Sequence, residues 1–352
     1  MAAAITAIHY CLPPGRLTND ELAERFGAKQ ISSIVKMAGI SERRIAPPGV
    51  TASDLAFVAA QRLLQSRGIA PAEIDLLVFV SQTGDYQIPA TACVLHGRLG
   101  LGQHCAAFDI NLGCSGYPYS LAVVDGLIGS GVAKKALLLN ADALTQVIHP
   151  RDRGLVPLHG DGAVATLLEP AAPGEGLCGI HLGTDGTGAA HLMIPASGAR
   201  KPRSEETKRE MVDASGSVRT DEHLAMNGPA VFHFSVYKVP EMIRAGLTKF
   251  GVGIGEVDLV VLHQANKTML ELIYKSIGVP AEKKFFFMEN VGNTSGASTP
   301  MALAEAVRQG RVAPGSLTLL ASFGVGLYWG MALLRWPAGG IPPVTASVEF
   351  AT

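Results

Sequence analysis

The sequence predicts an α/β protein built from two related halves, because one pattern of segments occurs twice along the chain. Two stretches, starting at Gly113 and at Asn293, each run from a turn of small residues through an amphipathic helix and a short loop into a buried strand. Their matched residues lie 180 positions apart: Gly116 with Gly296, Ala122 with Ala302, Val132 with Val312, and Ala133 with Ala313. Short apolar runs that alternate with helical stretches indicate central strands covered on both faces.

Two further pairs of segments support a duplicated chain. Residues 74–83 resemble residues 257–266, since each is a continuous apolar strand that ends in a polar turn. Short apolar strands also close each half, at 162–170 and 330–337. Three ordered matches at nearly one offset favour duplication over an arbitrary succession of α/β segments. The expected halves are residues 1–172 and 173–352.

Two segments lie outside this repeat. Residues 195–220 are polar and charged and are expected to form an exposed insertion. The tail from Pro337, which is rich in Gly and Pro at its start, is expected to pack loosely.

The composition favours a large, well-packed protein that does not bind nucleic acid. Of 352 residues, 48% are hydrophobic and 17% charged, and the net charge is −1 with acids and bases interspersed. The five cysteines include no Cys-x-x-Cys pair, so we expect neither a disulfide framework nor a bound metal. The start of the chain lacks the features of a secretory signal, and the apolar runs are strand-sized. We therefore expect a cytoplasmic protein that is not inserted in a membrane.

Cys114 is the first candidate for chemistry. It follows an apolar stretch and precedes a helix-like run, in a Gly-x-Cys-x-Gly turn that resembles a nucleophile elbow. A helix N-terminus favours the thiolate, which is the reactive form of cysteine. An arbitrary free cysteine is more often a buried core residue, and only this context favours a nucleophile.

His263 and Asn293 are the second and third candidates. His263 ends an apolar strand and is followed by polar residues, where sites in α/β proteins gather; alone, it is equally well a hydrogen-bonded core histidine. Asn293, beside a glycine, is equally well a turn or capping residue. However, it precedes the repeat counterpart of Cys114 by one position. The duplication would thus bring two equivalent helix starts to one cavity.

Five motifs, taken together and in order, resemble the β-ketoacyl-acyl-carrier-protein synthase III family. They are INLGCSGYPYSLAVVDGLIGSG, HPRDRGLVPLHGDGAVATLLE, VDLVVLHQANKTML, ENVGNTSGAS and SFGVGLYWGMALLRW, and they cover nearly the whole chain. The resemblance implies the thiolase fold, a homodimer, and catalytic residues Cys114, His263 and Asn293. It implies no cofactor, since the substrates are an acyl-CoA and a malonyl group on acyl carrier protein.

The implied reaction suits these residue types. Cys114 takes the acyl group as a thioester. Decarboxylation of the malonyl thioester gives an enolate, to which a neutral His263 and the Asn293 amide can donate hydrogen bonds. The carbanion then attacks the acyl-cysteine. By resemblance, the backbone N–H groups of Cys114 and Val325 bind the tetrahedral oxygen.

Several positions depart from the family pattern. Val325 replaces the middle residue of a glycine triplet, Ser33 and Met37 replace the tryptophan and arginine around the CoA adenine, and Ile88 replaces a phenylalanine that bounds the acyl pocket across the dimer. By resemblance, Arg153 and Asn266 also contact substrate, and carrier protein meets Lys267 and Thr268, while His233 stands at another site where a basic residue is expected. These changes leave the starter acyl group and the donor carrier open.

The same residues bear on two other enzymatic activities and on a non-catalytic role. An acyltransferase of this fold that acts on oxygen or nitrogen acceptors needs a base, which Asn293 cannot be. A thiolase needs a second cysteine near Val325, and none is there. A degenerate subunit that only supports a partner would not need all three polar side chains.

Overall fold

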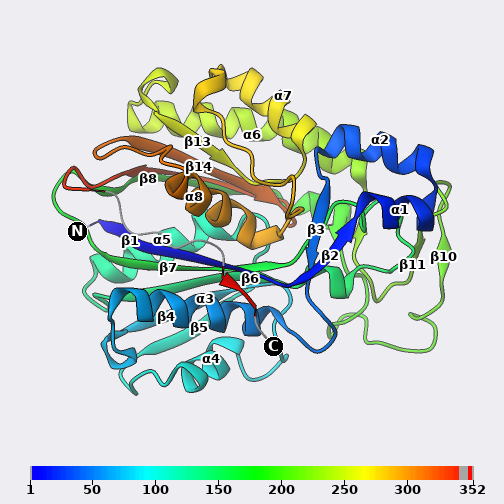
Figure 1. Ribbon diagram of the computed structural model, residues 1–352, viewed down its shortest axis with the longest axis horizontal. Helices are drawn as coiled ribbons and strands as arrows, with labels where there is room; N and C mark the ends of the chain where they lie inside the picture. Colours follow the sequence, from blue (N-terminus) through cyan, green and yellow to red (C-terminus); the bar gives the residue numbers. More distant parts are fainter. Residues whose placement is uncertain (1, 341–347, 351–352) are drawn as a thin grey trace.

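The computed structural model describes residues 2–340 and 348–350 and shows two stacked β-sheets with helices between and outside them (Figure 1). The first sheet has six strands in the order β16-β1-β7-β6-β4-β5. In that order their bounds are Val348–Glu349, Ala3–Leu12, Gly162–Pro170, Ala136–Asp142, Leu76–Val80 and Ala106–Ile110. The second sheet has four strands in the order β13-β14-β15-β8, with bounds Leu259–Leu262, Leu317–Gly324, Tyr328–Arg335 and Gly176–Thr184.

The two sheets repeat one topology. In the first sheet β1 is antiparallel to β7, β7 is antiparallel to β6, and β6 is parallel to β4. In the second sheet β8, β15, β14 and β13 follow each other with the same relative directions. The predicted fold of two equivalent halves is therefore confirmed. The chain passes from one sheet to the other between Pro170 and Gly176.

Helices α5 (Gly116–Gly129) and α8 (Ser298–Arg308) lie between the sheets and contact strands of both. The core side of α5 includes Leu121, Val124 and Ile128, all buried against apolar residues of the two sheets. Burial of each such side chain stabilises the fold by about 1.5–3 kcal/mol. Because both helices start at the same edge of the sandwich, the residues that precede them are brought close together.

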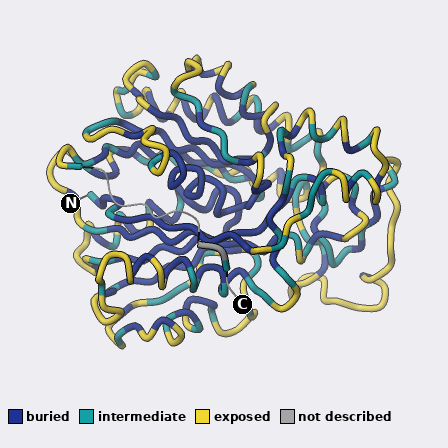
Figure 2. The backbone as a smooth tube through the Cα atoms, in the orientation of Figure 1, coloured by how far each residue is buried: buried dark blue, intermediate teal, exposed yellow. Residues whose placement is uncertain are grey.

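The outer helices complete the layers. Helices α3 (Ala52–Arg67) and α4 (Thr91–Leu99) cover the free face of the first sheet, and α6 (Gly228–Phe250) and α7 (Lys267–Ile277) cover that of the second. Figure 2 shows the sheets and central helices as buried, with the outer helices exposed on their solvent sides. No helix in the described part of the chain is long and apolar enough to cross a membrane.

A smaller group of elements lies at one end of the sandwich (Figure 1). It includes helices α1 (Asn19–Phe26) and α2 (Ala28–Ala38), and the strand pairs β2 (Gly15–Thr18) with β3 (Glu42–Ile45), β10 (Met211–Val212) with β11 (Val218–Arg219), and β9 (Leu192–Met193) with β12 (Ala225–Met226). The remaining regular segments are single 3-10 turns at Pro71–Glu73, Leu144–Val147, Gly186–His191, Ile254–Glu256, Ala281–Lys283 and Ser295–Ala297.

The insertion 195–220 is only partly as predicted. Most of residues 198–216 are exposed, but residues 217–220 are largely buried against the loop that precedes β7. There the N–H of Val218 donates to the carbonyl of Arg151, and Arg219 pairs with the buried carboxylate of Asp152. A buried carboxylate needs such a partner, which is why a charged segment folds inward here.

The prediction of a loosely packed tail falls largely outside the described residues. Of residues 341–352, only 348–350 are described. Within them, β16 pairs in parallel with the end of β1, Val348 opposite Cys11.

Candidate active site

Cys114 lies at the entrance of α5, one residue before Ser115, which caps that helix. Its side chain is 9% exposed and faces a cavity of about 320 Å³ that His263, Asn293 and Gly324 also line. A Cβ atom at position 324 would lie 2.6 Å from Cys114 Cβ, so only glycine leaves room beside the thiol. The cavity opens between Met37 and Phe232, which are 44% and 36% exposed.

The Cys114 sulfur is surrounded by donors and one negative charge. The backbone N–H groups of Cys114 and Val325 both reach Sγ, and Ser295 Oγ lies 3.8 Å from it. Burial nevertheless raises the pKa of the thiol to about 11, an effect to which the nearby carboxylate of Asp142 adds. The resting group is therefore the thiol, because desolvation outweighs the helix end and the hydrogen bonds that favour the thiolate.

His263 follows β13 and is buried, with 2% of its surface exposed. Burial, with a smaller contribution from nearby His159, lowers its pKa to about 3, so the ring is neutral. Its Nδ1 lies 2.5 Å from Ser298 Oγ, which also accepts a hydrogen bond from the backbone N–H of Gln264. Because the Ser298 hydroxyl donates to Nδ1, the hydrogen of the neutral ring is on Nε2.

Asn293 lies at the loop that leads to α8, and its orientation is fixed by two backbone contacts. Its N–H donates to the carbonyl of Leu158 at 2.9 Å, and its carbonyl accepts from Gly160 at 3.0 Å. Its side-chain oxygen accepts from the N–H of Ser295 at 3.0 Å. Ser295 has a left-handed φ of 51°, unusual for a residue other than glycine, and the turn holds it there.

The three predicted catalytic residues thus share one cavity, with two hydrogen-bond donors aimed into it. Nε2 of His263 and the amide nitrogen of Asn293 both carry hydrogens, for which the described part of the chain offers no acceptor. The arrangement can stabilise negative charge on a substrate oxygen while Cys114 holds a second group.

The predicted binding residues are less closely grouped. Met37 and Asn266 line the cavity, and Asn266 also caps α7 by accepting from Met269 N–H. Ser33 lies in a separate shallow groove with Gln30, whose side-chain oxygen accepts from Arg153. Ile88 does not line the cavity of its own chain and is 87% exposed.

The predicted carrier-protein contacts lie at the start of α7. Lys267 is exposed, and the Thr268 hydroxyl donates to the carbonyl of Met37, which ties α7 to α2 beside the mouth of the cavity. His233, on α6, packs its ring at a tilted angle against that of exposed Tyr237.

The sequence interpretation missed three residues of the site: His159, Ser295 and Ser298. His159 lines the cavity beside Asn293. Ser295 contacts the sulfur of Cys114, and Ser298 forms a hydrogen bond with His263. Their signals, a histidine before a Gly-Asp-Gly turn and serines just after Asn293, were present in the motifs. Among residues 2–340 and 348–350 there is no cluster of three or more His, Cys, Asp or Glu that could hold a metal ion.

Comparison with known proteins identifies relatives over nearly the full chain. Residues 108–186 match the family described as 3-oxoacyl-[acyl-carrier-protein (ACP)] synthase III, and residues 247–336 match its C-terminal part. A β-ketoacyl-[acyl-carrier-protein] synthase III of Streptomyces coelicolor is 38% identical over 339 residues, covering 96% of this chain and 98% of the relative.

Solved structures agree with these matches. A crystal structure of a 3-oxoacyl-(acyl-carrier-protein) synthase III superposes with a TM-score of 0.93 at 40% identity, covering 96% of this chain and 100% of the other. A 3-oxoacyl-(acyl-carrier-protein) synthase from Burkholderia xenovorans superposes with a TM-score of 0.91 at 35% identity, covering 99% and 97%.

Proposed function

The chain belongs to the 3-oxoacyl-[acyl-carrier-protein] synthase III family, and we propose from this that it joins an acyl group from acyl-CoA to malonyl-acyl carrier protein with loss of carbon dioxide. The observation that carries the proposal is the single cavity shared by Cys114, His263 and Asn293.

The first half-reaction loads Cys114. Its sulfur attacks the acyl-CoA carbonyl, the bond to the CoA sulfur breaks, and the thiol proton leaves with CoA as its free thiol. The N–H groups of Cys114 and Val325, which reach the sulfur in the free protein, are placed to bind the tetrahedral oxygen. Loss of one such donor typically costs on the order of 100-fold in rate.

The second half-reaction makes the carbon–carbon bond. Carbon dioxide leaves the malonyl thioester, and the enolate oxygen receives hydrogen bonds from His263 Nε2 and from the Asn293 amide. A neutral His263 suits this role, because decarboxylation requires no base and a donor is all that is needed. The carbanion attacks the acyl-cysteine, and Cys114 leaves as the thiolate.

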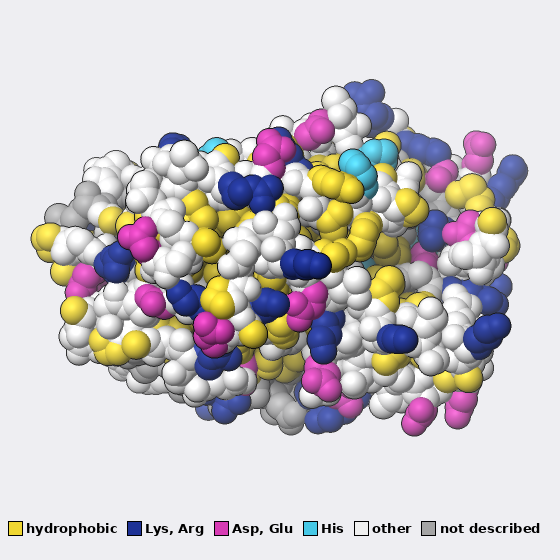
Figure 3. All heavy atoms as spheres, turned by 90° about the horizontal axis from the view of Figure 1, so that it is seen from above, with side chains coloured by type: hydrophobic (Ala, Val, Ile, Leu, Met, Phe, Trp, Pro, Cys, Tyr) yellow, Lys and Arg dark blue, Asp and Glu magenta, His cyan; other side chains and the backbone are white. Residues whose placement is uncertain are grey.

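The carrier protein would dock on the face formed by α2, α6 and α7. Figure 3 shows hydrophobic side chains exposed on this face among Lys and Arg side chains. The exposed apolar residues include Met37, Phe232 and Tyr237, and Lys267 lies beside the mouth. A phosphopantetheine arm that enters at Met37 reaches Cys114 through the cavity.

A second copy of the chain would cover the loop that holds Ile88. This loop also exposes 63% of Tyr86, and it lies near β5, which is the edge strand of the first sheet in the described residues. Exposed apolar side chains beside an open sheet edge are typical of a homodimer interface.

The test is product formation from labelled acyl-CoA and malonyl-acyl carrier protein, followed by mass spectrometry of the carrier protein. We expect a 3-oxoacyl product with the wild-type chain and none with Cys114→Ala. Transfer of the acyl group to an alcohol or amine, without release of carbon dioxide, would refute condensation.

A further inference from the structure

A second histidine, His159, lines the cavity and is itself buried. It is 7% exposed and lines the cavity together with Cys114 and Asn293. The backbone on either side of it is bonded to Asn293, through the carbonyl of Leu158 and the N–H of Gly160. Since His159 also lowers the pKa of nearby His263, its imidazole lies beside the reacting groups.

The ring of His159 has a defined tautomer. Its Nδ1 lies 3.0 Å from the carbonyl oxygen of Leu155, and because a carbonyl can only accept, Nδ1 carries the hydrogen. Burial lowers the pKa of His159, so the ring is neutral and Nε2 has a free lone pair. No residue in the described ranges 2–340 and 348–350 donates to Nε2. His263 is the opposite case, since its Nε2 carries the hydrogen.

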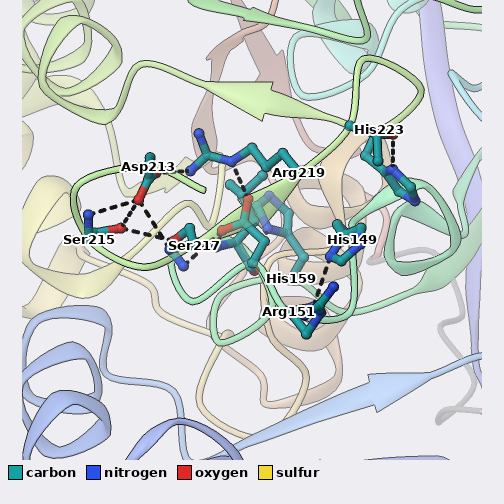
Figure 4. A network of polar contacts seen from close by, with 12 residues as sticks. His149, Arg151, His159, Asp213, Ser215, Ser217, Arg219 and His223 are labelled. Carbon is teal, nitrogen blue, oxygen red and sulfur yellow. Dashed lines mark hydrogen bonds and ion pairs between the residues drawn. The ribbon is translucent and has the colours of Figure 1, made fainter. Parts of the chain in front are cut away.

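Ion pairs from the inserted segment, residues 195–220, fix the position of the loop that carries His159 (Figure 4). Arg219 pairs with Asp152 and with Asp213, and the other oxygen of Asp152 accepts from the N–H groups of Gly154 and Leu155. The carbonyl that fixes the His159 ring thus belongs to a residue that is itself held in place. The lone pair has a fixed position in the cavity.

The walls near His159 are apolar, formed by Leu158, Leu192 and Met226. An acceptor in such surroundings favours a ligand that brings a hydrogen-bond donor, because an unpaired polar group is costly there. A malonyl carboxylate and a thioester carbonyl bring acceptors only. The amide N–H groups of the pantetheine arm are the same in every thioester substrate, so they cannot distinguish one starter acyl group from another.

We propose that His159 selects starter acyl groups that carry a hydroxyl close to the thioester. The inference rests on the proposed function, since it requires that Cys114 accept an acyl group. The hydroxyl donates to Nε2, while the hydrogen on Nδ1 remains on the Leu155 carbonyl. A methyl group in the same place would leave Nε2 unpaired and would be bound less well.

The test compares pairs of acyl-CoAs that differ only by a hydroxyl in place of a methyl group, measured as rates of Cys114 acylation by intact-protein mass spectrometry. Suitable pairs are 2-hydroxypropanoyl with 2-methylpropanoyl, 3-hydroxybutanoyl with 3-methylbutanoyl, and 4-hydroxybutanoyl with pentanoyl. We expect a preference of about tenfold for the hydroxyl member of at least one pair, as for one well-formed hydrogen bond. His159→Phe should abolish or reverse that preference. The pantetheine arm is common to both members, so its contacts cancel.

A matched control separates selection from a change in cavity size. Leu192→Ala enlarges the same cavity without altering the acceptor, so it should change both members of a pair together. The proposal is overturned if no pair shows the preference, or if His159→Phe leaves the ratio unchanged while still accepting the methyl-bearing groups. Absence of acylation by every donor would instead refute the proposed function.

Discussion

The side-chain oxygen of Asn293 accepts a hydrogen bond from the backbone N–H of Ser295 at 3.0 Å. This bond determines which end of the amide faces the cavity, because a backbone N–H can only meet the oxygen. The amide nitrogen is left to donate to a substrate. The turn that contains Asn293 and Ser295 thus directs the amide N–H groups of Asn293 to the cavity, where an enolate oxygen requires a donor.

Asn293→Asp tests that polarity directly. A carboxylate can still accept from Ser295, so the turn is preserved, but it offers no donor and repels the enolate. We expect carbon dioxide release from malonyl-acyl carrier protein to fall by about 100-fold or more, measured with labelled malonyl groups. Acylation of Cys114 should change little. Decarboxylation at the wild-type rate would remove Asn293 from the proposed role.

Ser298→Ala tests the tautomer of His263. Without the hydroxyl, nothing holds the hydrogen on Nε2, and we expect decarboxylation to slow by about tenfold, comparable to the loss of one hydrogen bond. Ser298→Thr, which keeps the hydroxyl, is the matched control and should retain more activity. Nitrogen NMR of labelled histidine should show the Nε2–H form in the wild type. An Nδ1–H form there would contradict the assignment.

The pH dependence of Cys114 reactivity follows from its raised pKa of about 11. Below that pH the resting group is a thiol, and the thiolate fraction rises about tenfold for each pH unit. We expect alkylation of Cys114 by iodoacetamide to accelerate in this proportion from pH 6.5 to 8.5. The control is Cys114→Ala, which removes the signal. A rate that is flat over this range would indicate a thiolate already formed at neutral pH.

The repeat made the fold largely predictable. Offsets of 180 residues for α5 with α8 and of 183 for β4 with β13 aligned the two halves, and the two sheets share one strand order. The insertion was harder, because its charges suggested exposure and nothing local marks Asp152 as a buried partner for Arg219. A long-range ion pair leaves no periodic signal.

The site was predictable where a residue type is chemically distinctive. Cys114, His263 and Asn293 stand at segment ends that the repeat brings together. The protonation state of Cys114 was not predictable, since burial depends on the packed cavity. His159 stands in one of the motifs, but the sequence does not show that its Nδ1 bonds to the Leu155 carbonyl and leaves Nε2 as an acceptor.

Stability should fall in mild acid because of buried histidines. Burial lowers the pKa of His9 from 6.5 to about 4, so between these values the unfolded chain binds a proton that the folded chain does not. The folded state is then favoured above pH 6.5 and loses about 1.4 kcal/mol per pH unit as the pH falls toward 4. Urea unfolding at pH 7, 6 and 5 measures this. His9→Gln should show a shallower loss, and an identical slope would contradict the assignment.

The most direct test of the whole account is a single-turnover chase of the acyl-enzyme. The chain is first loaded with an acyl-CoA, the acyl mass is located on Cys114 by peptide mass spectrometry, and malonyl-acyl carrier protein is then added. We expect the acyl mass to leave Cys114 at the same rate as a 3-oxoacyl group appears on the carrier protein, with one carbon dioxide released per turnover. An acyl group that never forms on Cys114, or that leaves it without appearing in a 3-oxoacyl product, would contradict the account.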